Sequence, residues 1–247
     1  MLFFARGMFL PIDADLNNWI WLMMSGFSGM FLGDLFLFQS YIEVGSRIAS
    51  LIMAVSPPIT ALLGYILLDE RLSVTSTIGM AITLLGIVIV ILSKEAGEKK
   101  VKINHSLKGL SYAFLGAFGQ SLGLILSKKG MANYHPLAAT QIRIIAGFIG
   151  FTILFLILKK FEDLKIALKD NKAMSAISVG SLFSPFIGVT LSLISLKYTS
   201  AGVSSTITAI TPVTIIPFSI LIFKEKIRSK EILGAVISVI GVAILFL

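Results

Sequence analysis

The chain of 247 residues contains no cysteine. This absence excludes disulfide bonds, thiolate metal ligands and thiol nucleophiles. Histidine is almost as scarce, because His105 and His135 are the only two in the sequence, and we expect no histidine-based metal site. The sequence also lacks the pattern G-x-x-x-x-G-K-[ST], whose loop holds nucleotide phosphates. We therefore expect no metal and no cofactor, and no ATP-driven step carried by this chain.

Charged residues are also scarce. Charged residues make up 14% of the chain, against about 25% in a soluble domain, whereas apolar residues make up 56%. Such a composition is typical of a membrane protein. The net charge of +8 would suit a nucleic-acid partner, but the lysines gather in short segments between apolar runs, where the positive-inside effect accounts for them. We expect a lipid bilayer as the partner, and no nucleic acid.

Long apolar runs are abundant. A helix that spans a bilayer needs about 20 mostly apolar residues, and eight runs approach this length, namely 19–41, 46–68, 74–93, 107–127, 137–159, 174–196, 201–223 and 230–247. The alternating ten-residue segments of a transmembrane β-barrel are missing. The sequence therefore predicts an all-α, polytopic integral membrane protein with about eight transmembrane helices.

An internal repeat organises these runs. Residues 31–92 align with residues 186–247 at an offset of 155 without a gap, and 13 of the 62 aligned pairs are identical. The matched pairs include unusual positions: Pro57 with Pro212, Glu70 with Glu225, and Gly79 and Gly86 with Gly234 and Gly241. Apolar composition alone does not readily align such residues, so the sequence predicts a duplicated helical bundle.

The two copies differ in length. The second copy starts near Leu107 with two runs ahead of the one at 174, and the same start in the first copy would fall about 48 residues before Met1. We therefore expect 1–93 to be a first repeat that lacks one helix and most of another. The segment 94–106 is a polar linker, and 107–247 is a second, five-helix repeat.

Two stretches carry a family resemblance. The first is "GSRIASLIMAVSPPITALLGYILLDERLS" followed by "IGMAITLLGIVIVIL", and its counterpart is "AGVSSTITAITPVTIIPFSILIFKEKIR" followed by "LGAVISVIGVAILFL". This pattern resembles the ten-helix EamA branch of the drug/metabolite transporter superfamily. The resemblance implies two inverted five-helix repeats around a central cavity. It also implies a secondary transporter, often an exporter, of small organic metabolites such as amino acids, working by alternating access in the plasma membrane.

Other functions stay open at this point. A lipid or glycolipid flippase of the same fold is one alternative, and a non-transporting scaffold or an inactive fragment is another. An intramembrane aspartyl protease is disfavoured, because Asp34 lacks a second intramembrane aspartate and paired acid–base chemistry needs both. We therefore expect a transporter and not an enzyme. Protons are the candidate coupling ion, and a homodimer is the candidate assembly.

Three polar residues lie inside apolar runs and are candidates for the substrate pathway. An ionised side chain at the bilayer centre costs about 2.5–3.5 kcal/mol on insertion scales, so such residues are often functional. Asp34 could couple protons or bind a substrate amine, or it could pair with Arg47. Arg143 could bind an anionic substrate group or Asp34, or extend to the membrane interface. Gln120 could read a polar substrate or join two helices.

Further candidates follow from spacing and from the repeat. Hydroxyl groups on one helical face add three positions to the expected pathway, Ser192, Thr208 and Thr211. Proline inside a helix removes a backbone hydrogen bond, so Pro57 and Pro212 are predicted helix hinges that could also line a cavity, with a fixed structural kink as the alternative. Glu70 and Glu225 end their runs and are predicted to be structural, as interfacial caps or salt bridges.

Membrane orientation has two conflicting indicators. Alternating the loops between the two sides places 15 lysine and arginine residues on one side and 5 on the other. The positive-inside rule then puts the C-terminus outside the cell. The family resemblance implies instead that both termini are cytoplasmic.

Overall fold

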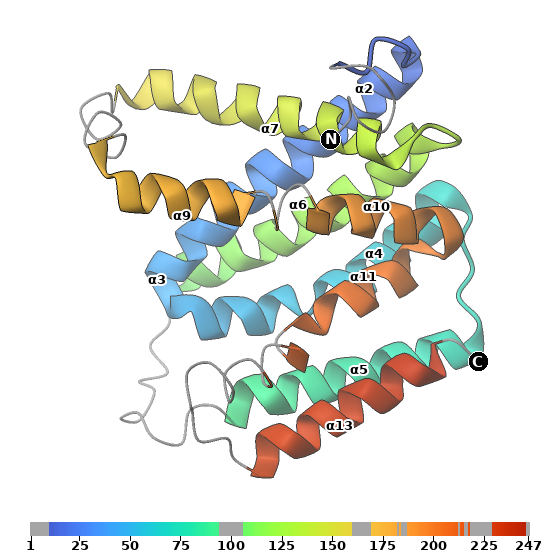
Figure 1. Cartoon of the computed structure of the whole chain (residues 1–247). Coiled ribbons are helices and arrows are strands. Elements are labelled where there is room, and N and C mark those ends of the chain that lie inside the picture. The colour runs from blue at the N-terminus through green and yellow to red at the C-terminus, as the bar shows by residue number, and fades with distance from the viewer. Residues whose placement is uncertain are drawn as a thin grey trace.

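The computed structural model describes residues 10–93, 106–159, 169–181, 183, 187–211, 213–214, 217 and 229–245, except for the side chains of Arg47 and Ser93. Within these ranges the chain is helical and forms no strand. The helices pack side by side, as Figure 1 shows, with α5 and α13 at one end of the row and α7 at the other. The predicted all-α class is confirmed.

Along the sequence, the helices form two groups, one before residue 94 and one after residue 106. The N-terminal group comprises α2 (Leu16–Ser25), the π-helix η1 (Gly26–Gly33), α3 (Asp34–Met53), α4 (Ser56–Leu68) and α5 (Val74–Ser93). The C-terminal group comprises α6 (Leu107–Met131), α7 (Pro136–Leu158), α9 (Asn171–Ser181), α10 (Val189–Tyr198), α11 (Ala201–Ala209) and α13 (Ser229–Ile244).

Five helical segments are long and apolar enough to cross a membrane: Leu16–Ser46, Ile48–Leu68, Val74–Leu92, Leu107–Met131 and Pro136–Leu158. The first of these segments ends one residue after Gly45, whose φ of 80° lies in the region that favours glycine. The other three expected runs, 174–196, 201–223 and 230–247, each include residues outside the described ranges. Their described parts form α9, α10, α11 and α13.

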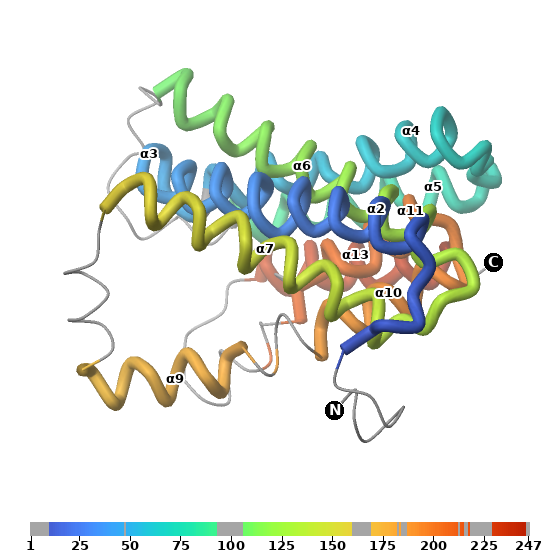
Figure 2. The backbone as a smooth tube through the Cα atoms, turned by 90° about the horizontal axis from the view of Figure 1, so that it is seen from above, coloured from blue at the N-terminus to red at the C-terminus, as the bar shows by residue number. Residues whose placement is uncertain are grey.

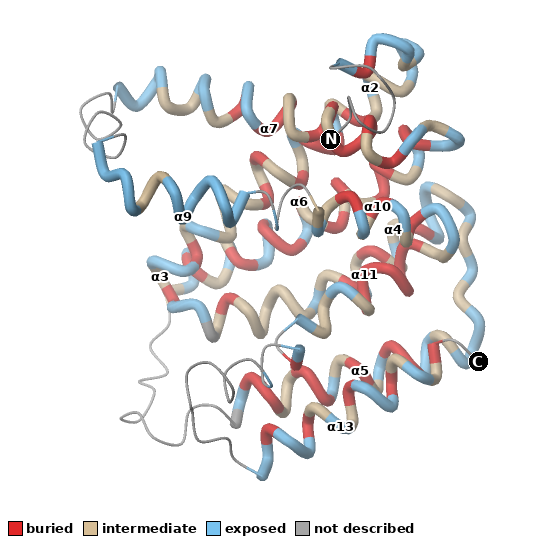
Figure 3. Tube along the Cα trace, viewed as in Figure 1, coloured by how far each residue is buried: buried red, intermediate tan, exposed pale blue. Residues whose placement is uncertain are grey.

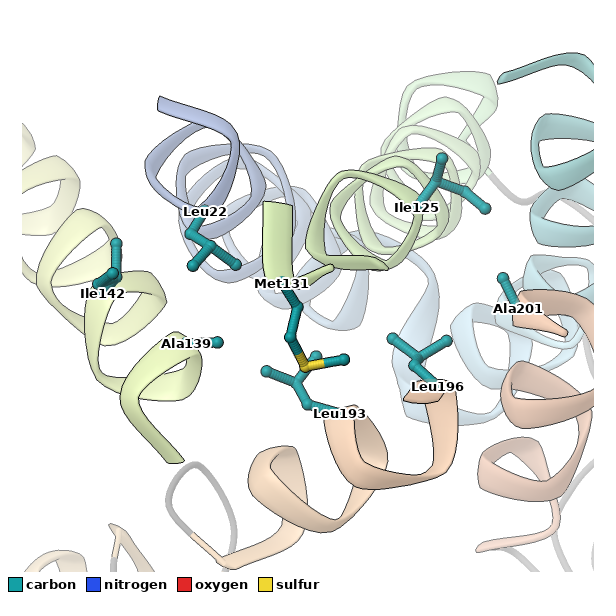
Figure 4. Packing of buried hydrophobic residues seen from close by; sticks show 8 residues of the cluster. All are labelled: Leu22, Ile125, Met131, Ala139, Ile142, Leu193, Leu196 and Ala201. Atoms are coloured by element: carbon teal, nitrogen blue, oxygen red, sulfur yellow. The ribbon is translucent and has the colours of Figure 1, made fainter. Parts of the chain in front are cut away.

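A central apolar cluster joins helices that are far apart in the sequence. Its fully buried members come from α2, α6, α7, α10 and α11 (Figure 4): Leu22, Ile125, Met131, Ala139, Ile142, Leu193, Leu196 and Ala201. Figure 3 shows exposed positions along the outer helices, and many of the exposed side chains are large and apolar. An apolar outer face is what a bilayer solvates, whereas water would not.

Helices α5 and α13 show the repeat directly. They run antiparallel, because Gly79 lies against Gly241, while Gly86 lies against Gly234. A Cβ atom added at Gly234 would come within 2.8 Å of the Gly86 carbonyl oxygen. Since the offset of 155 relates each helix to the other, equivalent glycines exchange places across the contact. This exchange is the signature of a two-fold axis between inverted copies.

Thr83 and Ser238, which lie between these glycines, follow the same two-fold relation. Thr83 and Ser238 are related by the same offset, and the Ser238 hydroxyl donates to the Thr83 carbonyl oxygen at 3.3 Å. Both residues are fully buried. The two helix backbones are therefore in direct contact at the axis, as is usual where small residues face one another in membranes.

The expected bend near Pro57 is a two-residue turn at Ala54 and Val55, within the segment Ile48–Leu68. Helix α3 ends at Met53 and α4 begins at Ser56, so buried Pro57 is the second residue of a new helix. Proline is well tolerated there, because the first helical N–H groups have no intrahelical partner. Helix α11 ends at Ala209, which is equivalent to Ala54, so the same interruption occurs in the second copy. Pro212 itself lies outside the described residues.

The two copies differ in what covers them. Helix α6 packs along α2, η1 and α3, and it fully buries Leu22. The offset of 155 takes Leu22 to Ile177 in α9, which is 61% exposed. Likewise Gly33 is buried under α6, whereas its counterpart Gly188 is exposed. Helix α9 contains no buried residue at all among its described positions (Figure 3).

Glu70 connects three helices instead of capping its own. Its carboxylate forms an ion pair of 2.5 Å with Lys128 in α6, and it accepts a hydrogen bond of 2.7 Å from the Ala201 N–H, the first residue of α11. An anion is favourable at a helix N-terminus, where N–H groups lack partners. Lys128 also donates to the Thr199 carbonyl oxygen. Glu70, which follows α4, therefore links α4 to α6 and to the first residue of α11. Glu225 lies outside the described residues.

We expect the substitution Gly86→Ala to lower the free energy of unfolding by about 1–3 kcal/mol. The new Cβ would lie 2.5 Å from the Ser238 nitrogen and 2.6 Å from the Gly234 carbonyl oxygen, so α13 must move away. The matched control is Gly180→Ala, where a Cβ meets nothing within 4 Å. That control should be neutral or slightly stabilising. Unfolding in mixed detergent micelles, followed by circular dichroism, measures both variants. Equal effects at the two positions would contradict the close helix contact.

We expect Glu70→Ala to cost about 1–3 kcal/mol of unfolding free energy, because it leaves the Ala201 N–H and the Lys128 ammonium without their acceptor. The control is Glu43→Ala. Glu43 pairs with Lys108 at 3.5 Å, but the Lys108 side chain is 63% exposed, and such pairs contribute about 0–1 kcal/mol. The same unfolding measurement applies. A Glu43→Ala cost as large as that of Glu70→Ala would show that the three-helix tie has no special role.

Candidate functional site

The candidate site surrounds the π-helix η1, which joins α2 to α3 within one long span. Three glycines and a serine make up half of η1, whose sequence is GFSGMFLG. The π-helical turn is wider than an α-helical one and is often found at functional sites. Figures 1 and 2 show α6 and α7 passing beside this span, and both helices contact η1.

Glycine contacts bring α6 and α7 close to η1. A Cβ at Gly119 in α6 would lie 3.0 Å from the Gly33 Cα, so the two backbones touch. On the other side, a Cβ at Gly26 would collide with the Arg143 backbone and lie 2.8 Å from the Ala146 Cβ in α7. Asp34 follows Gly33 and Gln120 follows Gly119, so these two polar residues are held within reach of each other.

Asp34 and Gln120 form the first contact of the site. The Gln120 side-chain amide donates to the Asp34 carboxylate at 2.6 Å and is 3.2 Å from the Gly29 carbonyl oxygen. Both side chains are half-buried. Gln120 thus joins α6 to the spanning segment, and Asp34 has a partner that sequence analysis did not assign to it. The Arg47 side chain, the partner weighed from sequence, lies outside the described part of the chain.

Arg143 is the charged residue most deeply enclosed in the described structure. Its side chain comes from α7 and is 5% exposed. A Nη2 atom lies 3.5 Å from the position a Gly29 Cβ would occupy. The Nε atom is buried and has no hydrogen-bond partner. The guanidinium therefore faces the interior of the bundle instead of extending towards the membrane interface.

Asp34 and Arg143 both approach Gly29, because Gln120, which donates to Asp34, also contacts the Gly29 carbonyl oxygen, while Arg143 Nη2 lies 3.5 Å from the position of a Gly29 Cβ. No ion pair joins these two described side chains, and the Asp34 contact at hydrogen-bond distance is with Gln120. The acid and the base therefore lie near the same glycine, Asp34 through Gln120 and Arg143 directly, without forming an ion pair. Such a site can bind charged or polar groups of a solute, because buried charges gain most from a partner that completes their hydrogen bonds.

A set of buried hydroxyl groups extends from this site and was not predicted from sequence. The Ser25 and Ser127 hydroxyls lie 2.6 Å apart between α2 and α6. The Ser56 and Ser121 hydroxyls lie 2.9 Å apart between α4 and α6. Thr60 then reaches Ser205 in α11 at 3.3 Å. The signal that could have found Ser121 and Ser127 is their position among the glycines of α6, beside Gln120.

The remaining predicted pathway residues lie elsewhere. Ser192 is half-buried in α10, and Thr208 and Thr211 are exposed near the end of α11. Their hydroxyls bond locally where the structure gives partners, Thr208 to the Ser204 carbonyl at 2.9 Å and Thr211 to the Thr208 carbonyl at 2.7 Å. No hydrogen bond or ion pair among the described residues connects them to Asp34, Gln120 or Arg143.

The π-helical turn recurs in the second copy. Residues 183, 187 and 188 are π-helical, and they are equivalent to 28, 32 and 33 in η1 at the offset of 155. Each copy thus has a widened turn at the same place in its first described span. In the first copy this turn adjoins Asp34. The equivalent position in the second copy is Val189, so that copy has no acid after its π-helical turn.

Groups that could hold a metal ion are absent from the described residues, since no cluster of three histidine, aspartate or glutamate side chains forms there. The polar atoms of the site are instead one carboxylate, one amide, one guanidinium and several hydroxyls. Such a set is suited to hydrogen bonding and charge complementarity.

The chain is similar to several known proteins. An "Uncharacterized transporter" of Archaeoglobus fulgidus is 25% identical over 252 residues, which cover 99% of this chain and 84% of that protein. An "Uncharacterized transporter" of Clostridium kluyveri is 26% identical over 193 residues, covering 78% of this chain and 61% of that protein. A solved crystal structure shares the fold with a TM-score of 0.72 at 16% identity, covering 98% of this chain and 79% of that one.

The family comparison agrees with the helical architecture. A model of the EamA-like transporter family matches residues 1–92 and 107–247, one match on each side of the polar linker. The resemblance inferred from the two proline- and glycine-containing motifs is thereby confirmed, and the chain belongs to the EamA-like transporter family of membrane proteins.

Proposed function

We propose that the protein is a secondary-active transporter that moves small organic metabolites, such as amino acids, by alternating access. The observation that carries this proposal is the placement of Asp34, Gln120 and Arg143 around one π-helical turn inside a bundle of spanning helices. Charged and amide groups inside a membrane bundle usually mark a solute or ion pathway. Family membership supports transport, and the site supports a polar or charged solute.

The site lies at the contact between the two proposed repeats. Asp34 and η1 belong to the first repeat, 1–93, whereas Gln120 and Arg143 belong to the second, 107–247. Rocking of one repeat against the other would separate η1 from α6 and α7 and open the site. Because the contact relies on glycine instead of interlocked side chains, helices can slide there without unpacking large residues.

The π-helical turns are the proposed joints of this motion. A π-helix has hydrogen bonds between residues five apart instead of four, so its return to α-helical geometry would rotate the residues that follow it. Asp34 follows η1 directly and would turn towards or away from Gln120. The helix breaks before Pro57 and at Ala209 are further points where the spans can bend.

Energy would come from an ion or solute gradient across the plasma membrane. Asp34 is the proposed proton-coupling residue, because it supplies the carboxylate of the site. Protonation would weaken its attraction to Arg143. Export is the proposed direction. A homodimer remains an expectation from sequence.

Reconstitution into liposomes tests this function. We expect the purified chain to carry at least one labelled metabolite from a panel of amino acids, sugars, nucleosides and organic acids, faster than empty liposomes do. An imposed pH gradient should change the rate, and Asp34→Asn should remove that change. The control is Glu43→Gln, which alters an acid outside the site. Correctly folded protein that moves no solute, with or without a gradient, would overturn the proposal.

A reversible cross-link tests the relative motion of the repeats. The natural chain has no cysteine, so Ser25→Cys together with Ser127→Cys introduces a single pair whose parent hydroxyls lie 2.6 Å apart, close enough for a disulfide. Oxidation should abolish most of the transport, because the bond ties the repeats together, and reduction should restore it.

The matched control pair joins two helices of one repeat. Thr140 in α7 and Thr190 in α10 have hydroxyls 3.2 Å apart, and cysteines at both positions should cross-link with little loss of transport. Equal inhibition by the two cross-links would contradict motion at the contact between η1 and α6.

A further inference from the structure

Two ion pairs among the described residues join the proposed repeats, and both use a lysine of helix α6. Near the end of α6, Lys128 pairs with Glu70 of the first repeat at 2.5 Å. Near its start, Lys108 pairs with Glu43 of the first repeat at 3.5 Å. With a rise of 1.5 Å per residue, the two lysines are separated by about 30 Å, the thickness of the hydrocarbon core. The two pairs therefore lie towards opposite faces of the membrane.

The candidate site lies between these two pairs along the same helix. Gln120, which donates to the Asp34 carboxylate at 2.6 Å, is located between Lys108 and Lys128 in α6. A solute held near Gln120 would therefore leave the bundle past one ion pair or past the other. Alternating access requires that the repeats part at one end of α6 while they stay together at the other.

The pair at Glu70 is better enclosed than the pair at Glu43. The Lys128 and Glu70 side chains are 25% and 17% exposed, against 63% and 27% for Lys108 and Glu43. Exposed pairs are screened by water and salt and contribute little. The helix dipole adds to the difference, because it favours a cation in the last turn of α6, where Lys128 lies, and disfavours one in the first turn, where Lys108 lies.

Further hydrogen bonds strengthen the enclosed pair. Glu70 accepts from the Ala201 N–H at 2.7 Å, and Lys128 donates to the Thr199 carbonyl oxygen. Both of these partners belong to the connection between α10 and α11. Parting the repeats at this end would leave charged and backbone groups without their partners at the same time, and such groups are costly to leave unpaired when they are poorly solvated.

We propose, resting on the alternating-access function above, that Glu70, Lys128 and Ala201 form a latch that holds the bundle closed at their end of α6. The weaker pair of Glu43 and Lys108 leaves the opposite end free to part first. Opening at the latch end requires the ion pair and the Ala201 hydrogen bond to break together. The latch thus sets which face of the membrane the site reaches in the resting protein.

A purely structural link is the competing explanation. In that case Glu70 only stabilises the folded bundle, and its loss would loosen both ends of α6 alike. The latch differs, because its loss should expose buried positions near Ala201 and leave buried positions near Lys108 protected. Accessibility at two matched positions therefore separates the two explanations.

Single cysteines can report this accessibility, because the natural chain has none. Ser204→Cys places a thiol in α11, one turn after Ala201, at a position that is 1% exposed. The Ser204 hydroxyl has no hydrogen-bond partner among the described residues, so the substitution removes no contact that the latch uses. Ala113→Cys is the matched probe near Lys108, because Ala113 lies in α6 and is fully buried.

The experiment measures the rate at which a water-soluble maleimide labels each probe in the purified full chain in detergent. Glu70→Gln keeps an acceptor for the Ala201 N–H but removes the charge, and it should raise the labelling rate of Ser204→Cys about tenfold. The rate at Ala113→Cys should change by less than about twofold, because distant sites act independently. Lys128→Gln should have the same effects, whereas Lys128→Arg keeps the charge and should leave labelling slow.

The other end of α6 supplies the control. Lys108→Gln should raise labelling of Ala113→Cys by no more than about threefold, because an exposed pair contributes little. It should leave the Ser204→Cys rate unchanged. Glu70→Gln combined with Lys128→Gln should raise that rate no further than either change alone, since each already breaks the pair.

The outcomes separate the latch from the structural link and from the proposed function. An equal rise at both probes in Glu70→Gln would establish the structural link and overturn the latch. An unchanged Ser204→Cys rate in folded Glu70→Gln and Lys128→Gln proteins would also overturn it, with folding established by circular dichroism and size-exclusion chromatography. Labelling needs no solute, so a latch found in a chain that moves nothing in liposomes would count against the transporter function alone. Transport without the expected labelling pattern would count against the latch alone.

Discussion

Close contact between helix backbones at glycine is the constraint on which the rest of this structure depends. Lipid cannot drive apolar helices together as water does, so helices in a bilayer associate mainly where small residues let their backbones approach. Gly86 and Gly234 allow this at the α5–α13 axis, and Gly119 and Gly33 allow it between α6 and η1. Larger side chains at these positions would move the helices apart and separate the polar groups they carry.

The candidate site follows from that contact. Once α6 and α7 lie against η1, Gln120 and Arg143 both contact Gly29, and Asp34 follows at the start of α3. The polar groups are therefore brought together by packing and not by attraction alone, since Asp34 and Arg143 form no direct ion pair in the described structure. A site assembled across a sliding contact suits a protein that must bind and then release a solute.

Symmetry and its loss both matter for function. The α5–α13 contact obeys the two-fold relation, and the π-helical turn occurs at equivalent places in both copies. The covering helices and the charges do not follow it, because Gly188 is exposed where Gly33 is buried, and Val189 stands where Asp34 does. The two copies thus share a frame, and divergence at this single position leaves an acid in the first copy where the second has valine.

The sequence by itself determined the helical class, the membrane environment, the repeat and the family, because these depend on composition, run length and recurring proline, glutamate and glycine, all of which are local or periodic. It also singled out Asp34, Gln120 and Arg143 as costly polar residues in apolar runs. Only the tertiary structure decided their partners. Asp34 contacts Gln120, 86 positions away, and Glu70 caps a helix that begins 131 positions later. Such pairings depend on which helix faces meet, and a linear pattern holds no information about the rotation of one helix against another.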